Sequence, residues 1–460
     1  MGPNILDRIK GWHLKKTISS LIEKEERGEI IVKKIAEQIE KISERAKDQG
    51  KMANSIKNVE SIFFKNPQGL KLLERIINNM HPNCRKKFFG DFLIRASVLR
   101  PPGYYKYEKK YGCPAPYTIL ISPTMRCNLR CVGCYANQYS KKDDLDFETV
   151  DRVISEGEKI GTLFYTILGG EPFIWEDLFK IFENHQNSYF QVFTNGTLLD
   201  EEKAKKLQKL GNVIVNFSIE GFEESTDERR QKGSFVKIME AMDLLKKYRV
   251  PFGYSICATR NNVEEALSDK FIDLMIEKGA LVGWYFLYMP VGKEVDLNLM
   301  PFPKQRLFMK ERRDQLRANK PIFLIDFWND APWVGGCIAG GRRFAHVNSN
   351  GDLEPCIFIH LAASNIKKTN LAEALNSPFF RGMRDKQPFS KNLYLPCQVL
   401  DNPEILKELV GKYHPYPTHQ GAEELVNRFF PCLTVYSQEA KKLYQPLWEK
   451  DKDKFPERRT

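Results

Sequence analysis

The stretch Met125-Arg126-Cys127-Asn128-Leu129-Arg130-Cys131-Val132-Gly133-Cys134-Tyr135 contains three cysteines at the spacing C-x3-C-x2-C. It comes just after an apolar run, residues 117–122, that predicts a β-strand. Three thiolates can hold three irons of a [4Fe–4S] cluster, whose usual full ligand set is four, so the fourth iron would be open to a small molecule. A loop that leaves a buried strand can bring three such ligands close together on a rigid scaffold.

Beyond this stretch, apolar runs alternate with amphipathic ones as far as about residue 290. Strands are expected at 117–122, 162–168, 188–194, 212–219, 251–258 and 281–289. Helices are expected between them, for example at 147–159, 200–210, 234–247 and 263–278. Six such βα units predict an α/β fold with a parallel sheet and helices outside it. In a parallel barrel, functional residues gather at the carboxyl ends of the strands.

The cysteine spacing after a first strand resembles the radical S-adenosylmethionine (radical SAM) superfamily. The resemblance implies a partial (β/α)6 TIM-like barrel in which Cys127, Cys131 and Cys134 bind a [4Fe–4S] cluster, with S-adenosylmethionine as second cofactor. A structural zinc site or unrelated core thiols are the alternatives. Zinc usually takes four nitrogen or sulfur ligands in paired spacings, and no second pair of cysteines stands nearby in the sequence.

The second expected strand ends in Gly169-Gly170-Glu171-Pro172. The resemblance implies that this motif meets the amino group of S-adenosylmethionine. Glycines let the backbone approach closely, and exposed carbonyl groups together with the Glu171 carboxylate can accept hydrogen bonds from an ammonium group. The alternative is a simple turn from strand to loop.

The third and fourth strands end in Thr194-Asn195-Gly196-Thr197 and Ser218-Ile219-Glu220-Gly221. The resemblance implies that polar side chains here, namely Thr194, Asn195, Ser218 and Glu220, approach the ribose and methionine parts of the cofactor. Ser218 is the first choice for a ribose hydroxyl. Arg229 or Arg230 could pair with the cofactor carboxylate in fork geometry, and a solvated helix face is the alternative for both.

Alternation along the fifth strand places Ser255, Cys257 and Thr259 on one face, which could be the barrel interior. The Cys257 thiol could give a hydrogen atom to a substrate radical, and a small buried core residue is the alternative. Many relatives have an aromatic residue just before the third cysteine, where this chain has Gly133, and Tyr135 follows the cysteine instead. We include Tyr135 among the expected cofactor-binding residues, with the stacking partner of adenine left open.

The C-terminal region carries a second group of cysteines. Thirteen residues separate Cys337 from Gly351, and four separate Gly351 from Cys356. This spacing resembles the opening of the SPASM/twitch extension and implies an auxiliary [4Fe–4S] cluster. A hairpin with Asn350-Gly351-Asp352 at its turn would bring the two thiols together. Cys397 is expected as a third ligand and Cys432 as a fourth, with a zinc site or core thiols as alternatives.

If Cys432 is not a ligand, one auxiliary iron would be open and could touch the substrate. Cys84 and Cys113 are interpreted as structural. The sequence thus predicts three regions: a basic helical region at 1–112, the radical SAM core at 113–320, and the SPASM/twitch-like iron–sulfur domain with C-terminal helices at 321–460.

The net charge of +12 is concentrated at the N-terminus. Residues 1–111 hold 24 Lys and Arg against 13 Asp and Glu, whereas the remaining 349 residues hold 47 against 46. Residues 1 to about 60 have a helical pattern, and 67–100 predict two helices split near His81-Pro82. Basic residues beside Phe and Tyr at 85–99, followed by an aromatic turn at 104–110, would suit a membrane surface or stacked RNA. The alternative is that the aromatics face the core.

The resemblance implies an enzyme that reductively cleaves S-adenosylmethionine to a 5′-deoxyadenosyl radical and removes hydrogen from an unactivated C–H bond. A reductant such as ferredoxin or flavodoxin would supply the electron. The substrate would be a peptide, a protein or a lipid-like molecule, and no DNA is expected. The alternatives are an RNA-modifying radical SAM enzyme and a non-enzymatic iron–sulfur electron-transfer protein.

Met1 to Gly11 has no apolar core of a signal peptide, and ten cysteines in 460 residues are too few for a small disulfide scaffold. We therefore expect a cytoplasmic protein that could make peripheral contact with a membrane through its N-terminal region.

Overall fold

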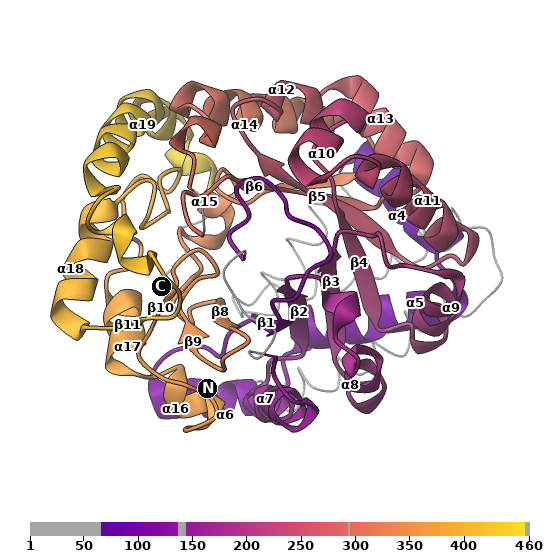
Figure 1. Cartoon of the computed structure of the whole chain (residues 1–460), viewed down its shortest axis with the longest axis horizontal. Coiled ribbons are helices and arrows are strands. Elements are labelled where there is room, and N and C mark those ends of the chain that lie inside the picture. The colour runs from indigo at the N-terminus through magenta and orange to yellow at the C-terminus, as the bar shows by residue number, and fades with distance from the viewer. Residues whose placement is uncertain (1–65, 137–143, 293–294, 456–460) are drawn as a thin grey trace.

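A computed structural model describes residues 66–136, 144–292 and 295–455 of the chain. The predicted helices before residue 60 lie outside these residues. Figure 1 shows a curved central sheet with helices around its outer side.

The core of the molecule is a nine-stranded sheet in the order β7-β6-β5-β4-β3-β2-β1-β8-β9. Its strands are β1 Thr118–Thr124, β2 Phe164–Gly169, β3 Tyr189–Thr194, β4 Val213–Ser218, β5 Phe252–Ala258, β6 Val282–Leu287, β7 Phe323–Asp326, β8 Phe344–Val347 and β9 Leu353–Glu354. All neighbouring strands pair in parallel except β8 and β9, which pair in an antiparallel hairpin. The predicted α/β fold with a parallel sheet is confirmed, and β1 to β6 are the six expected strands.

Amphipathic helices cover the outer face of this sheet (Figure 1). They are α7 Phe147–Ile160, α8 Leu178–Asn184, α9 Glu201–Leu210, α10 Glu223–Arg230, α11 Ser234–Lys247, α12 Val263–Ala266, α13 Asp269–Lys278 and α14 Pro303–Asn319. Local sequence sets their ends: Asp146, Asp200 and Ser268 each accept a hydrogen bond from a backbone N–H of the first turn. Valine, isoleucine, leucine and phenylalanine side chains from both layers form one continuous core.

The sheet continues past residue 320, where the sequence predicts a domain boundary. β7 extends one edge beyond β6, and β8 joins β1 at the other edge. The rest of this region consists of α15 Ala331–Val334, β10 Leu361–Ala362, α16 Leu371–Ala374, α17 Pro378–Asp385, α18 Pro403–Tyr413, β11 Tyr416–Pro417 and α19 Phe430–Asp451. Strands from both sides of the expected boundary therefore share one sheet, and the β8–β9 hairpin lies directly beside the strand that precedes the cysteine loop.

The N-terminal helices pack onto the core. They are α4 Pro67–Asn79, α5 Pro82–Lys87, the π-helix η2 Phe88–Leu99, and α6 Pro102–Tyr111. The break near residue 81 is confirmed. The aromatic turn expected at 104–110 is wrong, because that segment is helical. Pro102 occupies the first turn, where its missing N–H costs nothing, and Tyr104 and Tyr107 are buried one turn apart.

The aromatic rings of η2 face the sheet. Phe92 lies 4.9 Å from Phe164 and 5.2 Å from Tyr189 between ring centroids, so the helix covers the amino ends of β2 and β3. Arg85 is also buried, and its guanidinium donates to the carbonyl oxygen of Ile77 at 3.0 Å. The rings of Phe88 and Phe92 and the Arg85 guanidinium thus pack onto the core, as the alternative interpretation of this segment expected. In the described part of the chain, no helix combines the length and apolar character needed to cross a bilayer.

Replacing Phe92 by alanine tests this core role. We expect Phe92→Ala to lower the free energy of unfolding by about 3 kcal/mol, because a large aromatic contact is lost. Urea-induced unfolding followed by circular dichroism measures the change. Lys109→Ala, at an exposed position of α6, serves as control and should stay within about 0.5 kcal/mol of the wild type. A stable Phe92→Ala variant that had lost liposome binding would contradict the core role.

Candidate active site

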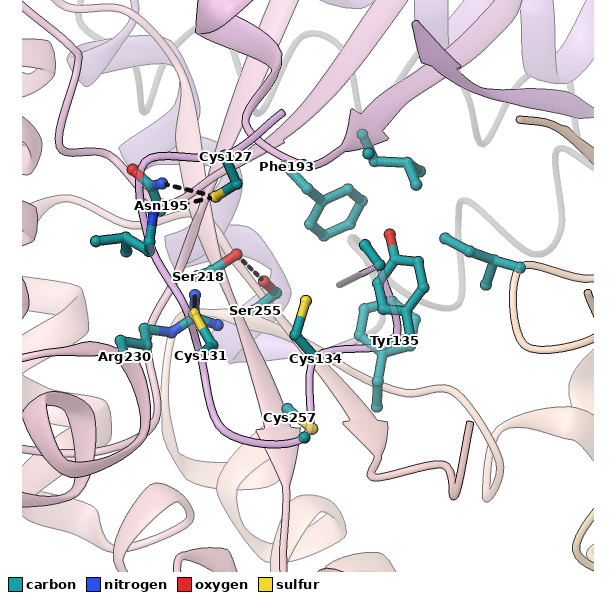
Figure 2. A pocket seen from close by; sticks show the side chains of 18 of the residues that line it. Cys127, Cys131, Cys134, Tyr135, Phe193, Asn195, Ser218, Arg230, Ser255 and Cys257 are labelled. Carbon is teal, nitrogen blue, oxygen red and sulfur yellow. Dashed lines mark hydrogen bonds between the residues drawn. The ribbon is translucent and has the colours of Figure 1, made fainter. Parts of the chain in front are cut away.

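A cavity of about 600 Å³ opens at the carboxyl ends of the parallel strands (Figure 2). Every strand from β1 to β6 contributes a side chain or glycine to its wall. Twelve of the residues singled out from the sequence line it: Cys127, Cys131, Cys134, Tyr135, Gly169, Gly170, Thr194, Asn195, Ser218, Arg229, Arg230 and Cys257. Glu171, Pro172 and Glu220 do not line it.

The cysteine loop is held against β2 by the backbone of the glycine pair. The N–H of Gly170 donates to the carbonyl oxygen of Thr124 at 3.0 Å, and the N–H of Glu171 donates to that of Arg126 at 2.8 Å. A Cβ atom on Gly170 would lie 2.2 Å from the Arg126 carbonyl oxygen. Gly169 has a φ of +128°, a value that side chains disfavour. These glycines therefore allow the backbone of the cysteine loop and the backbone that follows β2 to approach closely.

The Glu171 carboxylate has a different position from the one expected. It is fully buried and accepts hydrogen bonds from Thr194 Oγ1 at 2.7 Å and from the backbone N–H groups of Asn195 and Phe173 at 2.8 and 3.1 Å. Burial raises the pKa of Glu171. The prediction that this carboxylate meets the cofactor's ammonium is not supported, because its acceptor sites are used to join the end of β3 to β2. Pro172 is likewise buried behind the wall.

Asn195 reaches from the end of β3 to the cysteine loop. Its Nδ2 donates to Asn128 Oδ1 at 2.9 Å and lies 3.8 Å from Cys127 Sγ. The N–H of Leu129 also points at this sulfur, at 3.4 Å. Burial raises the pKa of Cys127 to about 11. Hydrogen bonds of this kind are a recognised means of tuning a thiolate that binds iron.

Arg229 and Arg230 lie behind the second and third cysteines. Both form ion pairs with Glu220, at 2.6 and 2.5 Å, and Arg230 Nη1 lies 3.9 Å from Cys131 Sγ. Their side chains are 14% and 11% exposed, so the alternative of a solvated helix face is wrong. Glu220 is fully buried and acts on the site through these two guanidinium groups.

Two hydroxyls and a thiol line the wall formed by β4 and β5. Ser218 Oγ and Ser255 Oγ are 3.4 Å apart, and Cys257 follows on the same strand face (Figure 2). Burial raises the pKa of Cys257 to about 11, which keeps it as an S–H group at neutral pH. Thr259 does not join them, because its hydroxyl contacts Asn262 Oδ1 at 3.1 Å and is buried.

The three loop cysteines face one cavity from a single loop (Figure 2). Three thiols on one loop can serve as three ligands of a [4Fe–4S] cluster. Among the described residues, no three His, Cys, Asp or Glu side chains are close enough together to hold one metal ion.

The second group of cysteines is formed around the β8–β9 hairpin. The predicted turn is confirmed, since Asn348 Oδ1 accepts hydrogen bonds from the N–H groups of Asn350 and Asp352, each at 3.0 Å. Burial raises the pKa of Cys337 to about 12, with the neighbouring Cys397 adding to the rise. Burial likewise raises the pKa of Cys356, and both other thiols add to it. The charges of Cys337, Cys356 and Cys397 thus influence one another, and all three side chains pack half-buried against the core.

Cys432 differs from these three in its surroundings. It is exposed on the first turn of α19, whereas the others pack half-buried against the core. Its placement gives no support to the prediction of a fourth auxiliary ligand. Cys84 is buried between α5 and α9, where its sulfur lies 3.8 Å from the carbonyl oxygen of Gln208, as expected of a structural thiol.

The sequence analysis missed the residues that join the two cysteine groups. Ile357 and Phe358 follow Cys356 and line the cavity, and the Phe358 ring meets the edge of Tyr135 at 6.0 Å between centroids. Phe193 and Phe286 complete the apolar wall, with centroids 6.0 Å apart. Phe193 and Phe286 could have been found from the sequence, because they stand near the carboxyl ends of predicted strands. No sequence pattern indicated that Phe358 packs on Tyr135.

Two family models match this chain. One describes the radical SAM superfamily and matches residues 121–269, and the other describes an iron–sulfur cluster-binding domain and matches residues 337–399. A protein of Methanocaldococcus jannaschii of uncharacterized function is 32% identical over 254 residues, which make up 52% of this chain and 84% of the relative. The chain belongs to the radical SAM superfamily. It is an enzyme whose core binds a [4Fe–4S] cluster and S-adenosylmethionine, and its C-terminal domain implies an auxiliary iron–sulfur cluster.

Other members of the superfamily are similar over a comparable length. An AdoMet-dependent heme synthase of Methanosarcina barkeri is 28% identical, over 59% of this chain and 86% of the relative. A PqqA peptide cyclase of a Methylobacterium species is 27% identical, over 63% and 80%. Among solved structures, SuiB of Streptococcus suis bound to S-adenosylmethionine has the same fold, with a TM-score of 0.54 and 17% identity over 64% of this chain and 75% of SuiB.

Substitution of Gly170 tests the approach of the two backbones. We expect Gly170→Ala to reduce the iron bound by the loop cysteines roughly tenfold or more, because displaced supporting groups commonly cost that much metal affinity. Iron per chain after anaerobic reconstitution measures the effect. Gly411→Ala is the control, since a Cβ there would meet nothing within 4 Å. Full iron content in Gly170→Ala would show that the loop does not need this contact.

The auxiliary cysteines allow a second count of iron. We expect Cys397→Ala to lower the iron content of the holoprotein and its absorbance near 400 nm by roughly half, because one of two clusters would lose a ligand. Cys432→Ala should leave both unchanged because its thiol is exposed and apart. Equal losses in the two variants would make Cys432 a ligand.

Proposed function

We propose that this enzyme removes a hydrogen atom from an unactivated C–H bond of an apolar part of its substrate, after reductive cleavage of S-adenosylmethionine in the cavity of Figure 2. When bound, the cluster and S-adenosylmethionine together supply this one-electron chemistry. The observation that carries the proposal is the gathering of the three loop cysteines, the glycine pair, Asn195 and Ser218 around one cavity. A pure electron-transfer protein has no need of such a cofactor pocket.

The residues of the chain have separable tasks in this proposal. The loop thiols would hold three irons, and the carbonyl groups beside Gly169 and Gly170 would accept hydrogen bonds from the cofactor's ammonium. Ser218 would meet a ribose hydroxyl. The apolar wall with Phe193 and Phe286 would exclude water from the reacting atoms. Arg229 and Arg230 are already paired with Glu220, so they would offset the negative charge of the cysteine site and not bind the cofactor carboxylate by themselves.

The cavity wall bears on the substrate class. Among the described residues, no Asp or Glu side chain lines it, so a cationic group of a substrate would find no counter-ion on this part of the wall. A peptide segment with apolar side chains or a lipid-like molecule fits this wall. The relatives named as a PqqA peptide cyclase and an AdoMet-dependent heme synthase support a peptide and extend the candidates to molecules of the haem class. An external one-electron donor such as ferredoxin or flavodoxin would reduce the core cluster.

Single replacements in the cysteine loop test the proposed function. We expect Cys127→Ala, Cys131→Ala and Cys134→Ala each to lower formation of 5′-deoxyadenosine by the dithionite-reduced holoenzyme by about 100-fold or more, because each removes an iron ligand. Chromatography of the quenched reaction measures the nucleoside. Cys84→Ala is the control, since this thiol contacts the carbonyl oxygen of Gln208 and does not line the cavity. Wild-type holoenzyme that failed to release the nucleoside would end the proposal.

The role of Cys257 is tested separately. If the Cys257 thiol gives a hydrogen atom to the substrate, the Cys257→Ser variant should still form 5′-deoxyadenosine, at a rate within about threefold of the wild type. The mass-shifted product in a lysate should disappear or change mass, because an O–H bond is a poorer hydrogen-atom donor than an S–H bond. Mass spectrometry follows both. An unchanged product would leave Cys257 as a wall residue.

A further inference from the structure

Glu354, at the end of β9, is a buried carboxylate outside the cavity. Its side chain is fully buried and faces four donors. His346 Nδ1 lies 2.7 Å from Oε2, while Asn348 Nδ2, His360 Nδ1 and Thr418 Oγ1 lie 2.9, 3.4 and 2.5 Å from Oε1. A carboxyl group surrounded by donors is held in its ionised, acceptor-only form. The fold thus keeps a fixed negative charge at this point.

This charge is connected to both ends of the cysteine loop. His346 Nε2 is hydrogen-bonded to Ser122 Oγ at 2.7 Å, and Ser122 lies on β1 five residues before Cys127. At the other end, the His360 ring is nearly parallel to that of Tyr135, at 6.3 Å between centroids and 10° between planes. Tyr135 directly follows Cys134.

The same carboxylate also adjoins the auxiliary cysteines. Glu354 stands two residues before Cys356, and the carbonyl oxygen of the intervening Pro355 accepts from the N–H of Gly340 at 2.8 Å. Gly340 comes three residues after Cys337. Glu354 is therefore linked through His346 and His360 to both ends of the cysteine loop, and it stands two residues before an auxiliary cysteine.

We propose that Glu354 is a positioning residue shared by the two iron–sulfur sites, which joins them and lowers the reduction potential of the clusters they hold. This inference rests on the proposed function. Reduction adds negative charge to a cluster, and a fixed buried carboxylate nearby disfavours that addition because the interior screens charge poorly. The charge of the surroundings is a known determinant of cluster potentials. The cavity-facing arginines act in the opposite direction on the core site.

The test is a redox titration of the reconstituted full-length holoenzyme at pH 8, followed by electron paramagnetic resonance. Every variant is measured in the same buffer and at the same pH. Glu354→Gln keeps the size of the side chain and removes the charge. We expect the ratio of reduced to oxidised cluster at a fixed solution potential to rise at least tenfold, or about 59 mV for a one-electron couple.

Two further variants separate charge from packing. Thr418→Val keeps the shape of its side chain but removes one donor from the carboxylate, so its charge is less compensated and the reduced fraction should fall. This opposite shift also decides the case if Glu354→Gln does not fold. Glu158→Gln is the matched control: Glu158 faces His185 Nδ1 at 3.2 Å and Ser188 Oγ at 2.7 Å, outside the cavity wall, and should leave the potentials unchanged.

Each outcome has one meaning. Opposite shifts in Glu354→Gln and Thr418→Val, with none in Glu158→Gln, support the proposal. Unchanged potentials in Glu354→Gln, or an upward shift in Thr418→Val, overturn it while leaving the proposed function intact. A wild-type protein without any reducible cluster signal would instead overturn the proposed function, so the two failures are distinguishable.

Discussion

The organisation of this protein depends on a contact between two backbones. The chain leaving β2 donates two N–H groups to the carbonyl groups just before the first loop cysteine, and only the absence of side chains at Gly169 and Gly170 permits that distance. The position of Cys127, the next residue, is thereby fixed relative to the sheet. Side chains from β3, such as Asn195, reach the same loop from one strand further along. Backbone hydrogen bonds thus fix the position of the thiols, in a closely packed interior that leaves the loop little room to move.

Around this fixed loop the charges are ordered in layers. Arg229 and Arg230 stand behind Cys131, and Glu220 stands behind them. On the other side of the loop, Glu354 lies beyond Tyr135 and His360. Each of these buried charges is met by an opposite charge or by hydrogen-bond donors, which offsets the cost of removing it from water. Among the described residues, arginines line the cavity and carboxylates do not.

The sequence predicted those parts in which chemistry and local pattern coincide. The six core strands, the loop cysteines and the hairpin before Cys356 follow from short-range periodicity and spacing, which chain neighbours determine. The fate of Glu171 could not be predicted, because its hydrogen-bond partners Thr194 and Asn195 come from the next strand. The hydrogen bond between Ser122 and His346 joins residues 224 positions apart in the sequence, and no local sequence pattern predicts it. The segment expected as an aromatic turn at 104–110 is helical, and Pro102 is well suited to the first turn of that helix.

The π-helix η2 packs across the amino ends of the central strands, where Phe88 and Phe92 contact Tyr189 and Phe164. The cavity with the three thiols lies at the opposite, carboxyl ends of β1 to β6, and Ile357 and Phe358 of the C-terminal region also line it. Residues that follow an auxiliary cysteine therefore border the same space as the loop cysteines, so a molecule bound there would touch both regions of the chain.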